Sequence, residues 1–160
     1  MKYRRLQKDE LEELEPNFIR FLAAHSIGGD DWLRLKTENP AEVEQLISKF
    51  SDVVFEKTLK NLNYLQHNSP KDIKIFHCQA DKMVMMGLKV EGASSIDFTQ
   101  NNDKDAMMQA IRNSGAELQV YRAEKTYNGD REMELFQMME QGCRISDGSL
   151  FEVIRDLVGA

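Results

Sequence analysis

The chain has 160 residues, 41% of them hydrophobic and 30% charged, and a formal net charge of −6. This length and composition are typical of one folded domain with a substantial core, and they exclude a disordered chain. The acidic balance argues against a general nucleic-acid binder, because such a protein needs a basic surface to neutralise phosphate groups. We therefore predict a single globular domain over residues 1–160.

The two cysteines, Cys78 and Cys143, do not form a CxxC motif. Two cysteines are too few for a disulfide framework, so the sequence favours a reducing cytoplasm. Lys2, Arg4 and Arg5 lie near the start of the chain, but charged and polar residues follow where a signal peptide needs an apolar run. No apolar stretch approaches the roughly 20 residues of a membrane span. We predict a cytoplasmic protein that does not contact a membrane.

The N-terminal part of the chain, about residues 8–60, carries helical patterns. Between Leu11 and Leu22, apolar residues recur every three or four positions, which indicates one buried stripe. Pro16 interrupts the stripe, so either two short helices meet there or one helix kinks. His25 falls at a predicted helix end, where an imidazolium can contact free backbone carbonyl groups.

The strongest helix signal in the chain begins at Asn39. Asn39 can cap a helix, Pro40 suits the first helical position and Glu42 suits the third. An apolar stripe that starts at Val43 continues toward residue 60, and the opposite face is charged. This segment is predicted to be one long amphipathic helix.

The hydrophobic period changes to two from Leu62 onward, which predicts strands in the part from about 61 to 127. We expect strands near residues 62–67, 73–79, 83–90, 96–98 and 118–122. A helix opening at Asp103 could make a crossover, so the sheet could be mixed. Two C-terminal helices follow within about 130–158. This order predicts an α+β domain with an antiparallel or mixed sheet of about four to five strands, flanked by about five helices.

The stretch of residues 72–90 reads as a hairpin with apolar side chains on both faces. A hairpin of an ordinary antiparallel sheet has one polar face, so here either a helix layer or a partner chain must cover each side. On one of the two faces lie four residues that we predict as interface candidates: Phe76, Cys78, Met83 and Met85. Methionines also cluster in a later helix, at Met133, Met138 and Met139. Such side chains serve either as core filler or as an adaptable binding surface.

His77, Asp97 and Tyr127 are the candidates for a catalytic site. His77 and Cys78 cannot share a target, because adjacent strand residues point to opposite faces. Asp97 lies between two apolar residues. It is either partly buried with a shifted pKa, or it faces solvent at a sheet edge, where its charge prevents pairing with another strand. Gathered at the sheet edge, the three could form an unrecognised polar site. The sequence contains no phosphate-binding glycine motif, and we predict no cofactor and no metal site.

The basic start of the chain contains Tyr3, Arg4 and Arg5. This arm could touch the phosphates of RNA or DNA, or it could pair with the acidic helices of its own chain. We favour the second interpretation, because the arm is short and the protein is acidic.

Several segments together resemble an uncharacterised family of short proteins from Bacteroidetes bacteria: the opening MKYRRL, the pairs Phe18-Ile19 and Phe21-Leu22, and the triplets Phe50-Ser51-Asp52, Phe76-His77-Cys78 and Ile96-Asp97-Phe98. The resemblance spans nearly the whole chain. It implies a small bacterial cytoplasmic protein and transfers no catalytic residue.

From the residues themselves, we predict a non-enzymatic protein that binds another protein or forms a homodimer. The alternative is an enzyme or small-molecule binder that uses the polar site of His77, Asp97 and Tyr127.

Overall fold

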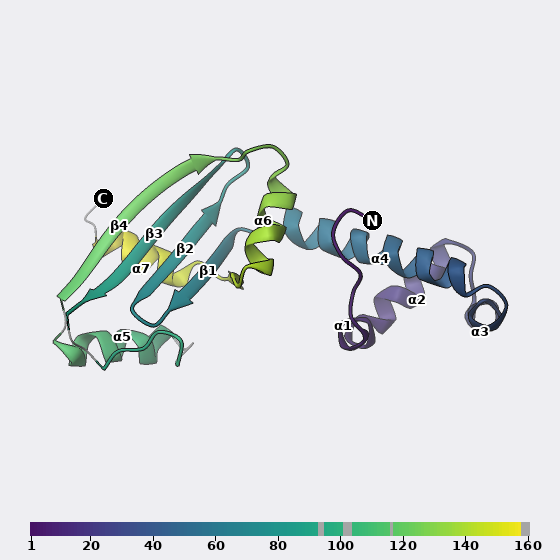
Figure 1. Ribbon diagram of the computed structural model, residues 1–160, viewed down its shortest axis with the longest axis horizontal. Helices are drawn as coiled ribbons and strands as arrows, with labels where there is room; N and C mark the ends of the chain where they lie inside the picture. Colours follow the sequence, from purple (N-terminus) through teal and green to yellow (C-terminus); the bar gives the residue numbers. More distant parts are fainter. Residues whose placement is uncertain (93–94, 101–103, 116, 158–160) are drawn as a thin grey trace. The chain divides into compact units, whose positions relative to one another are not determined.

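The computed structural model describes residues 1–92, 95–100, 104–115 and 117–157. The chain divides into two compact units, Met1–Lys60 and Asn61–Ala160. We call them the N-terminal unit and the C-terminal unit and describe each by itself (Figure 1). The division falls where the period of the apolar residues changes from helical to alternating, between the helical part and the sheet-containing part expected from the sequence.

The N-terminal unit consists of four helices: α1 (Lys8–Glu13), α2 (Glu15–Ala24), α3 (Gly29–Glu38) and α4 (Pro40–Lys60). Two helices meet just before Pro16, which occupies the first turn of α2, where its missing N–H costs nothing. His25 ends α2, and its Nδ1 lies 2.9 Å from the carbonyl oxygen of Phe21. Asn39 caps α4, since its Oδ1 accepts the backbone N–H of Glu42 at 3.3 Å.

Aromatic rings pack together in the N-terminal unit, beside buried aliphatic side chains such as Leu46 and Ile47. The ring of Phe18 packs against Phe50 at 4.9 Å and meets Trp32 edge-on at 5.2 Å between centroids. The buried Ser51 accepts a hydrogen bond from the backbone N–H of Leu6 at 2.9 Å and donates one to the backbone carbonyl of Ile47 at 2.7 Å. The serine thereby fastens the segment before α1 to the middle of α4.

The C-terminal unit contains a five-stranded sheet in the order β4-β3-β2-β1-β5, and all four strand pairs are antiparallel. The strands are β1 (Tyr64–Ser69), β2 (Asp72–Cys78), β3 (Lys82–Glu91), β4 (Glu117–Thr126) and β5 (Arg144–Ser146). Three helices accompany them: α5 (Lys104–Ser114), α6 (Arg131–Glu140) and α7 (Ser149–Leu157). The predicted α+β class is confirmed, with seven helices in the described ranges instead of about five. Asp103, expected to open α5, lies outside the described residues.

Residues 96–98 do not form the predicted fourth strand. Ile96 and Phe98 are buried in the core, and the backbone N–H of Phe98 donates to the carbonyl of Pro70 at 3.0 Å. Their alternation with Asp97 therefore reflects packing of a loop rather than pairing in the sheet. The fifth strand is instead β5, which the sequence analysis missed because it has three residues and its Ile145 is largely exposed.

The sheet has two different faces. The first face carries Ile73 and Ile75 of β2 together with Val84, Met86 and Leu88 of β3, and their core also includes side chains of α5 and α7. Figure 1 shows α7 passing behind the strands on this side. Two helices thus cover the first face.

The second face carries Leu65, Phe76, Cys78, Met83 and Met85, which the strand register places side by side. Helix α6 lies against this face, since its Met133 and Met138 line a cavity together with Phe76 of β2 and Met83 of β3. Leu65, Cys78 and Met83 are buried, whereas Phe76 and Met85 are half-buried. A helix of the same chain therefore provides part of the cover that the hairpin requires, and part of this face remains accessible.

Candidate functional site

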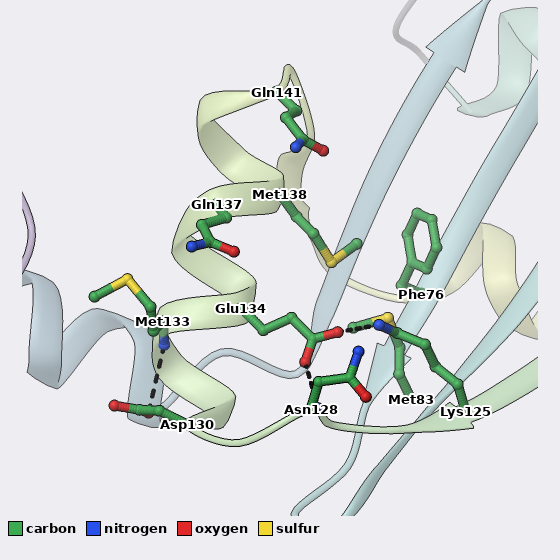
Figure 2. A pocket seen from close by; sticks show the side chains of 10 residues that line it. All are labelled: Phe76, Met83, Lys125, Asn128, Asp130, Met133, Glu134, Gln137, Met138 and Gln141. Atoms are coloured by element: carbon green, nitrogen blue, oxygen red, sulfur yellow. Dashed lines mark hydrogen bonds and ion pairs between the residues drawn. The ribbon is translucent and has the colours of Figure 1, made fainter.

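A groove of about 550 Å³ lies between α6 and the second face of the sheet. Figure 2 shows the side chains that line it: Phe76, Met83, Lys125, Asn128, Asp130, Met133, Glu134, Gln137, Met138 and Gln141. Its floor is apolar and is formed by Phe76 of β2, Met83 of β3 and Met138 of α6. Its rim is polar and comes from α6, the segment before it and Lys125 of β4. Two of the four predicted interface residues, Phe76 and Met83, thus lie in the groove.

Helix α6 is held in place by its first residues. Asp130 caps the helix, because its carboxylate accepts the backbone N–H groups of Glu132 and Met133. The guanidinium of Arg131 then donates to three backbone carbonyls: Leu62 at 2.7 Å, Cys78 at 2.9 Å and Gln79 at 2.9 Å. These carbonyls lie just before β1 and at the end of β2, so one side chain ties α6 to two neighbouring strands.

The rim of the groove contains one ion pair. Lys125 of β4 contacts the carboxylate of Glu134 on α6, and that carboxylate also accepts the backbone N–H of Asn128 at 3.0 Å. Burial raises the pKa of Glu134, but the hydrogen bonds from Lys125 and Asn128 outweigh it, so the net pKa is lowered. Glu134 is therefore ionised at neutral pH, and its contact with Lys125 joins α6 to the end of β4 at the rim of the groove.

The floor of the groove is made of flexible apolar side chains. In Figure 2, Met138 extends from α6 toward the ring of Phe76, and Met83 lies below them. Methionine side chains are unbranched and polarizable, so they adapt to differently shaped apolar groups. The groove can thus accept an apolar side chain, while Asn128, Gln137 and Gln141 can hydrogen-bond to the backbone that carries it.

Cys78 cannot supply a nucleophile to this groove. Its side chain is 2% exposed, and burial raises the pKa of the thiol to about 12 despite the nearby charge of Arg131. It behaves as a small apolar residue of the second face. Adjacent residues of β2 do face opposite sides, since the neighbouring His77 contacts α7 on the first face.

The three catalytic candidates have structural partners of their own. The His77 ring stacks on Tyr64 at 4.6 Å and meets Phe151 at 5.6 Å. The hydroxyl of Tyr127 donates to the carbonyl of Gln79 at 2.8 Å. Asp97 accepts hydrogen bonds from the hydroxyl and the backbone N–H of Thr99, and these bonds lower its pKa.

Asp97 is not close to the other two candidates. The residue after it, Phe98, is bonded to Pro70 at one end of β2, whereas Tyr127 is bonded to Gln79 at the other end. An extended segment from residue 70 to residue 79 spans roughly 30 Å, at about 3.3 Å per residue. The structure therefore does not bring Asp97 into one site with His77 or Tyr127.

The basic N-terminal arm pairs with acidic side chains of its own unit. Arg4 makes two hydrogen bonds to the Glu10 carboxylate, at 2.9 and 3.0 Å, and its guanidinium lies 4.9 Å from the centre of the Phe55 ring. Arg5 contacts Glu44 at 3.3 Å, and the hydroxyl of Tyr3 donates to Glu56. These contacts are those expected if the arm pairs with acidic helices of its own chain.

Two features are absent from the described part of the chain. Nowhere in it do three or more His, Cys, Asp or Glu side chains come together as a potential metal site. None of its helices combines the length and the apolar character that crossing a bilayer requires.

Comparison with known proteins gives a family of unknown function. A family model described as a family of unknown function, DUF6495, matches residues 1–159. The chain belongs to this family. The resemblance to an uncharacterised family, noted from the sequence, is thereby confirmed. No curated protein and no solved structure matches the chain, so no residue of this chain is assigned a role from a relative.

Sequence reasoning missed Arg131, the residue that anchors the site. An arginine after a capping aspartate looks like a solvated residue at a helix start, and nothing in the pattern shows that three carbonyls converge on it. The methionines of α6 were visible as a cluster, but only the fold reveals that Met138 faces Phe76.

Proposed function

We propose that this protein is a small binding protein whose groove between α6 and the sheet holds an apolar side chain of a segment from another protein. One observation carries the proposal: beside α6, the second face is open to a methionine- and phenylalanine-lined groove with a hydrogen-bonding rim. Accessible apolar surface rimmed by polar groups is typical of protein-protein contact sites.

The four predicted interface residues take different parts in this proposal. Cys78 and Met83 are 2% and 3% exposed, so they support the floor of the groove from inside. Phe76 and Met85 are half-buried neighbours in the strand register and are available to a partner. The interaction would therefore depend on Phe76 and Met138 more than on the residues beneath them.

We also propose that the protein acts in the cytoplasm of a bacterium. Cys78 and Cys143 are free thiols in the structure, which suits a reducing compartment. The resemblance to short proteins of Bacteroidetes bacteria supports the bacterial origin. Fractionation of such cells, followed by immunodetection, tests this part.

Site-specific photocrosslinking tests the groove. A photoreactive phenylalanine analogue replaces Gln137, an exposed residue of the rim, and in a control protein it replaces the exposed Gln109 of α5. In cells of the source organism, we expect a discrete crosslinked protein from position 137 and none from position 109. Mass spectrometry then identifies the partner, which is purified for binding measurements.

Calorimetry on the purified pair gives the quantitative result. Met138→Glu places a charge against the apolar floor and is expected to weaken binding by about tenfold or more, because truncated or charged anchors at an interface centre cost most. Gln109→Glu adds the same charge to α5 and should leave the affinity unchanged. Equal crosslinking at both positions, or equal affinity for both glutamate variants, would contradict the proposal.

A further inference from the structure

Strand β4 forms one edge of the sheet in the C-terminal unit. It has ten residues, Glu117–Thr126, and within the described part of the chain it pairs with β3 alone. Its residues are all exposed or half-buried, and Figure 1 shows β4 as the outermost strand of this unit. A long edge presents a row of backbone N–H and C=O groups that can pair with another strand. The opposite edge, β5, has three residues and offers far less.

Two residues of opposite charge lie two positions apart on β4, on the same face of the sheet. Arg122 and Glu124 lie on the first face, since their β3 partners are Met86 and Val84 of the core. Their side chains are 52% and 44% exposed and contact each other at 2.9 Å. Both charged groups can therefore reach a strand that pairs with the outer edge of β4.

We propose that a second copy of this chain pairs with β4 through its own β4, antiparallel, with the two-fold axis at Ala123. Strands related by such an axis form a self-complementary interface, in which each contact occurs twice. The two five-stranded sheets would join into one continuous sheet. The inference does not depend on the proposed function, because it rests on the pairing of a strand edge and not on occupation of the groove.

In this register, opposite charges of the two β4 strands lie directly across from each other. Arg122 lies directly opposite Glu124 of the second copy, and the symmetry axis repeats this pair. On the same face, Val120 lies opposite Thr126 of the second copy. Directly opposed charges of opposite sign stabilise antiparallel strands, and like charges destabilise them.

The second face fits the same register. Tyr121 lies opposite Lys125 of the second copy, and the small Ala123 meets its own counterpart on the axis. The Tyr121 ring is fixed in advance, because it lies across Gly87 and its hydroxyl donates to Asp72. An added Cβ at Gly87 would fall within 2.0–2.5 Å of that ring, so the glycine leaves room for it. A fixed ring beside a lysine stem loses little conformational freedom on pairing.

Neighbouring registers are less favourable. Centring the axis on residue 122 sets Arg122 against its own copy, and centring it on residue 124 does the same for Glu124. Centring it on Tyr121 pairs Lys125 with Glu117 but sets Arg122 against Val120 and Glu124 against Leu118. The charges thus select the Ala123 register while they oppose pairing in the adjacent ones.

A charge swap in the full-length protein tests the pairing. Sedimentation equilibrium between about 1 µM and about 1 mM covers the affinities expected for a small interface. We expect wild type to dimerise, and Arg122→Glu to weaken the dimer roughly tenfold or more because two attractive pairs become repulsive. The double variant R122E/E124R restores opposite charges and should recover the dimer. Circular dichroism confirms that each variant is folded.

A disulfide reports the register directly. In a Cys143→Ser background, Ala123→Cys places two thiols on the axis, where directly opposed residues have the Cα separation that a disulfide needs. We expect a crosslinked dimer under mild oxidation. Thr126→Cys is the matched control, because its two copies lie several residues apart in this register. A monomer throughout the concentration range, a dimer indifferent to the charge swap, or equal crosslinking at 123 and 126 would overturn the proposal.

Discussion

At the scale of single residues, His77 shows how a titratable group can be part of the core packing. The ring lies between Tyr64 and Phe151, and it belongs to the face that α7 covers. Burial lowers the pKa of His77 from its usual value, and the positive charge of Arg155 lowers it further. The neutral imidazole is therefore the form that the fold stabilises.

This shift gives a pH-dependent stability with a defined sign. Because the pKa of His77 is lower in the folded chain than the value of 6.5 in the unfolded chain, protons bind preferentially to the unfolded state below about pH 7. We expect the free energy of unfolding to fall as the pH drops from 7 toward 5. Urea denaturation at intervals across this range measures it.

Two variants without a titratable ring serve as controls. His77→Phe keeps an aromatic ring beside Tyr64, and His77→Gln does not, so they separate the charge from the stacking. Both should remove the part of the pH dependence that His77 causes. A slope that persists unchanged in both variants would show that other groups cause it.

At the scale of secondary-structure elements, the attachment of α6 depends on Arg131. Its side chain is 14% exposed and donates to carbonyls of Leu62, Cys78 and Gln79. Arg131→Lys retains the charge but has one nitrogen where the guanidinium uses two, so it cannot serve all three carbonyls. Gln79 keeps the hydroxyl of Tyr127 as a donor, whereas the carbonyl of Leu62 or Cys78 loses its donor. We expect the free energy of unfolding to fall by about 2–4 kcal/mol, given the cost of unsatisfied buried groups. Urea denaturation monitored by circular dichroism measures this loss.

The exposed Arg112 of α5 provides the comparison for Arg131. Arg112→Lys makes the same chemical change outside any such cluster and should alter stability by less than about 0.5 kcal/mol. Equal effects of the two substitutions would mean that the carbonyl contacts of Arg131 do not stabilise the fold.

Elements could be predicted from the sequence where burial follows a period. The strands of residues 72–90 were predicted because Ile73, Ile75 and their β3 partners alternate with the second face. The same rule failed at Ile96 and Phe98, where a loop packs two apolar residues into the core without joining the sheet. It also failed at β5, because a strand of three residues with an exposed Ile145 has no detectable period.

The candidate site was less predictable than the strands. The apolar second face could be read from Phe76 and Met83, because strand alternation fixes which residues share a face. The groove itself could not, because it needs the position of α6, and that position depends on contacts between Arg131 and carbonyls more than fifty residues away in the chain. Backbone acceptors leave no mark in a sequence pattern.

At the scale of the whole molecule, the chain forms two compact units, whereas the sequence predicts a single domain. The two descriptions predict different effects for a substitution that destabilises the N-terminal unit: unfolding of that unit alone, or unfolding of the whole chain. Ser51 is fully buried in the N-terminal unit, and its hydroxyl joins Leu6 to α4. Ser51→Ala leaves the buried backbone N–H of Leu6 without an acceptor and should lower the free energy of unfolding by about 1–3 kcal/mol.

Hydrogen exchange on Ser51→Ala distinguishes the two descriptions. If each unit unfolds on its own, exchange becomes faster in peptides from residues 1–60, and protection in residues 61–157 stays at the wild-type level. We expect this result, because each unit has buried side chains of its own, among them Leu46, Phe50 and Leu59 in one and the sheet core in the other. Thr37→Ala removes an exposed hydroxyl from the same unit and should change neither. Faster exchange throughout the chain in Ser51→Ala would instead mean that the whole chain unfolds as one cooperative domain.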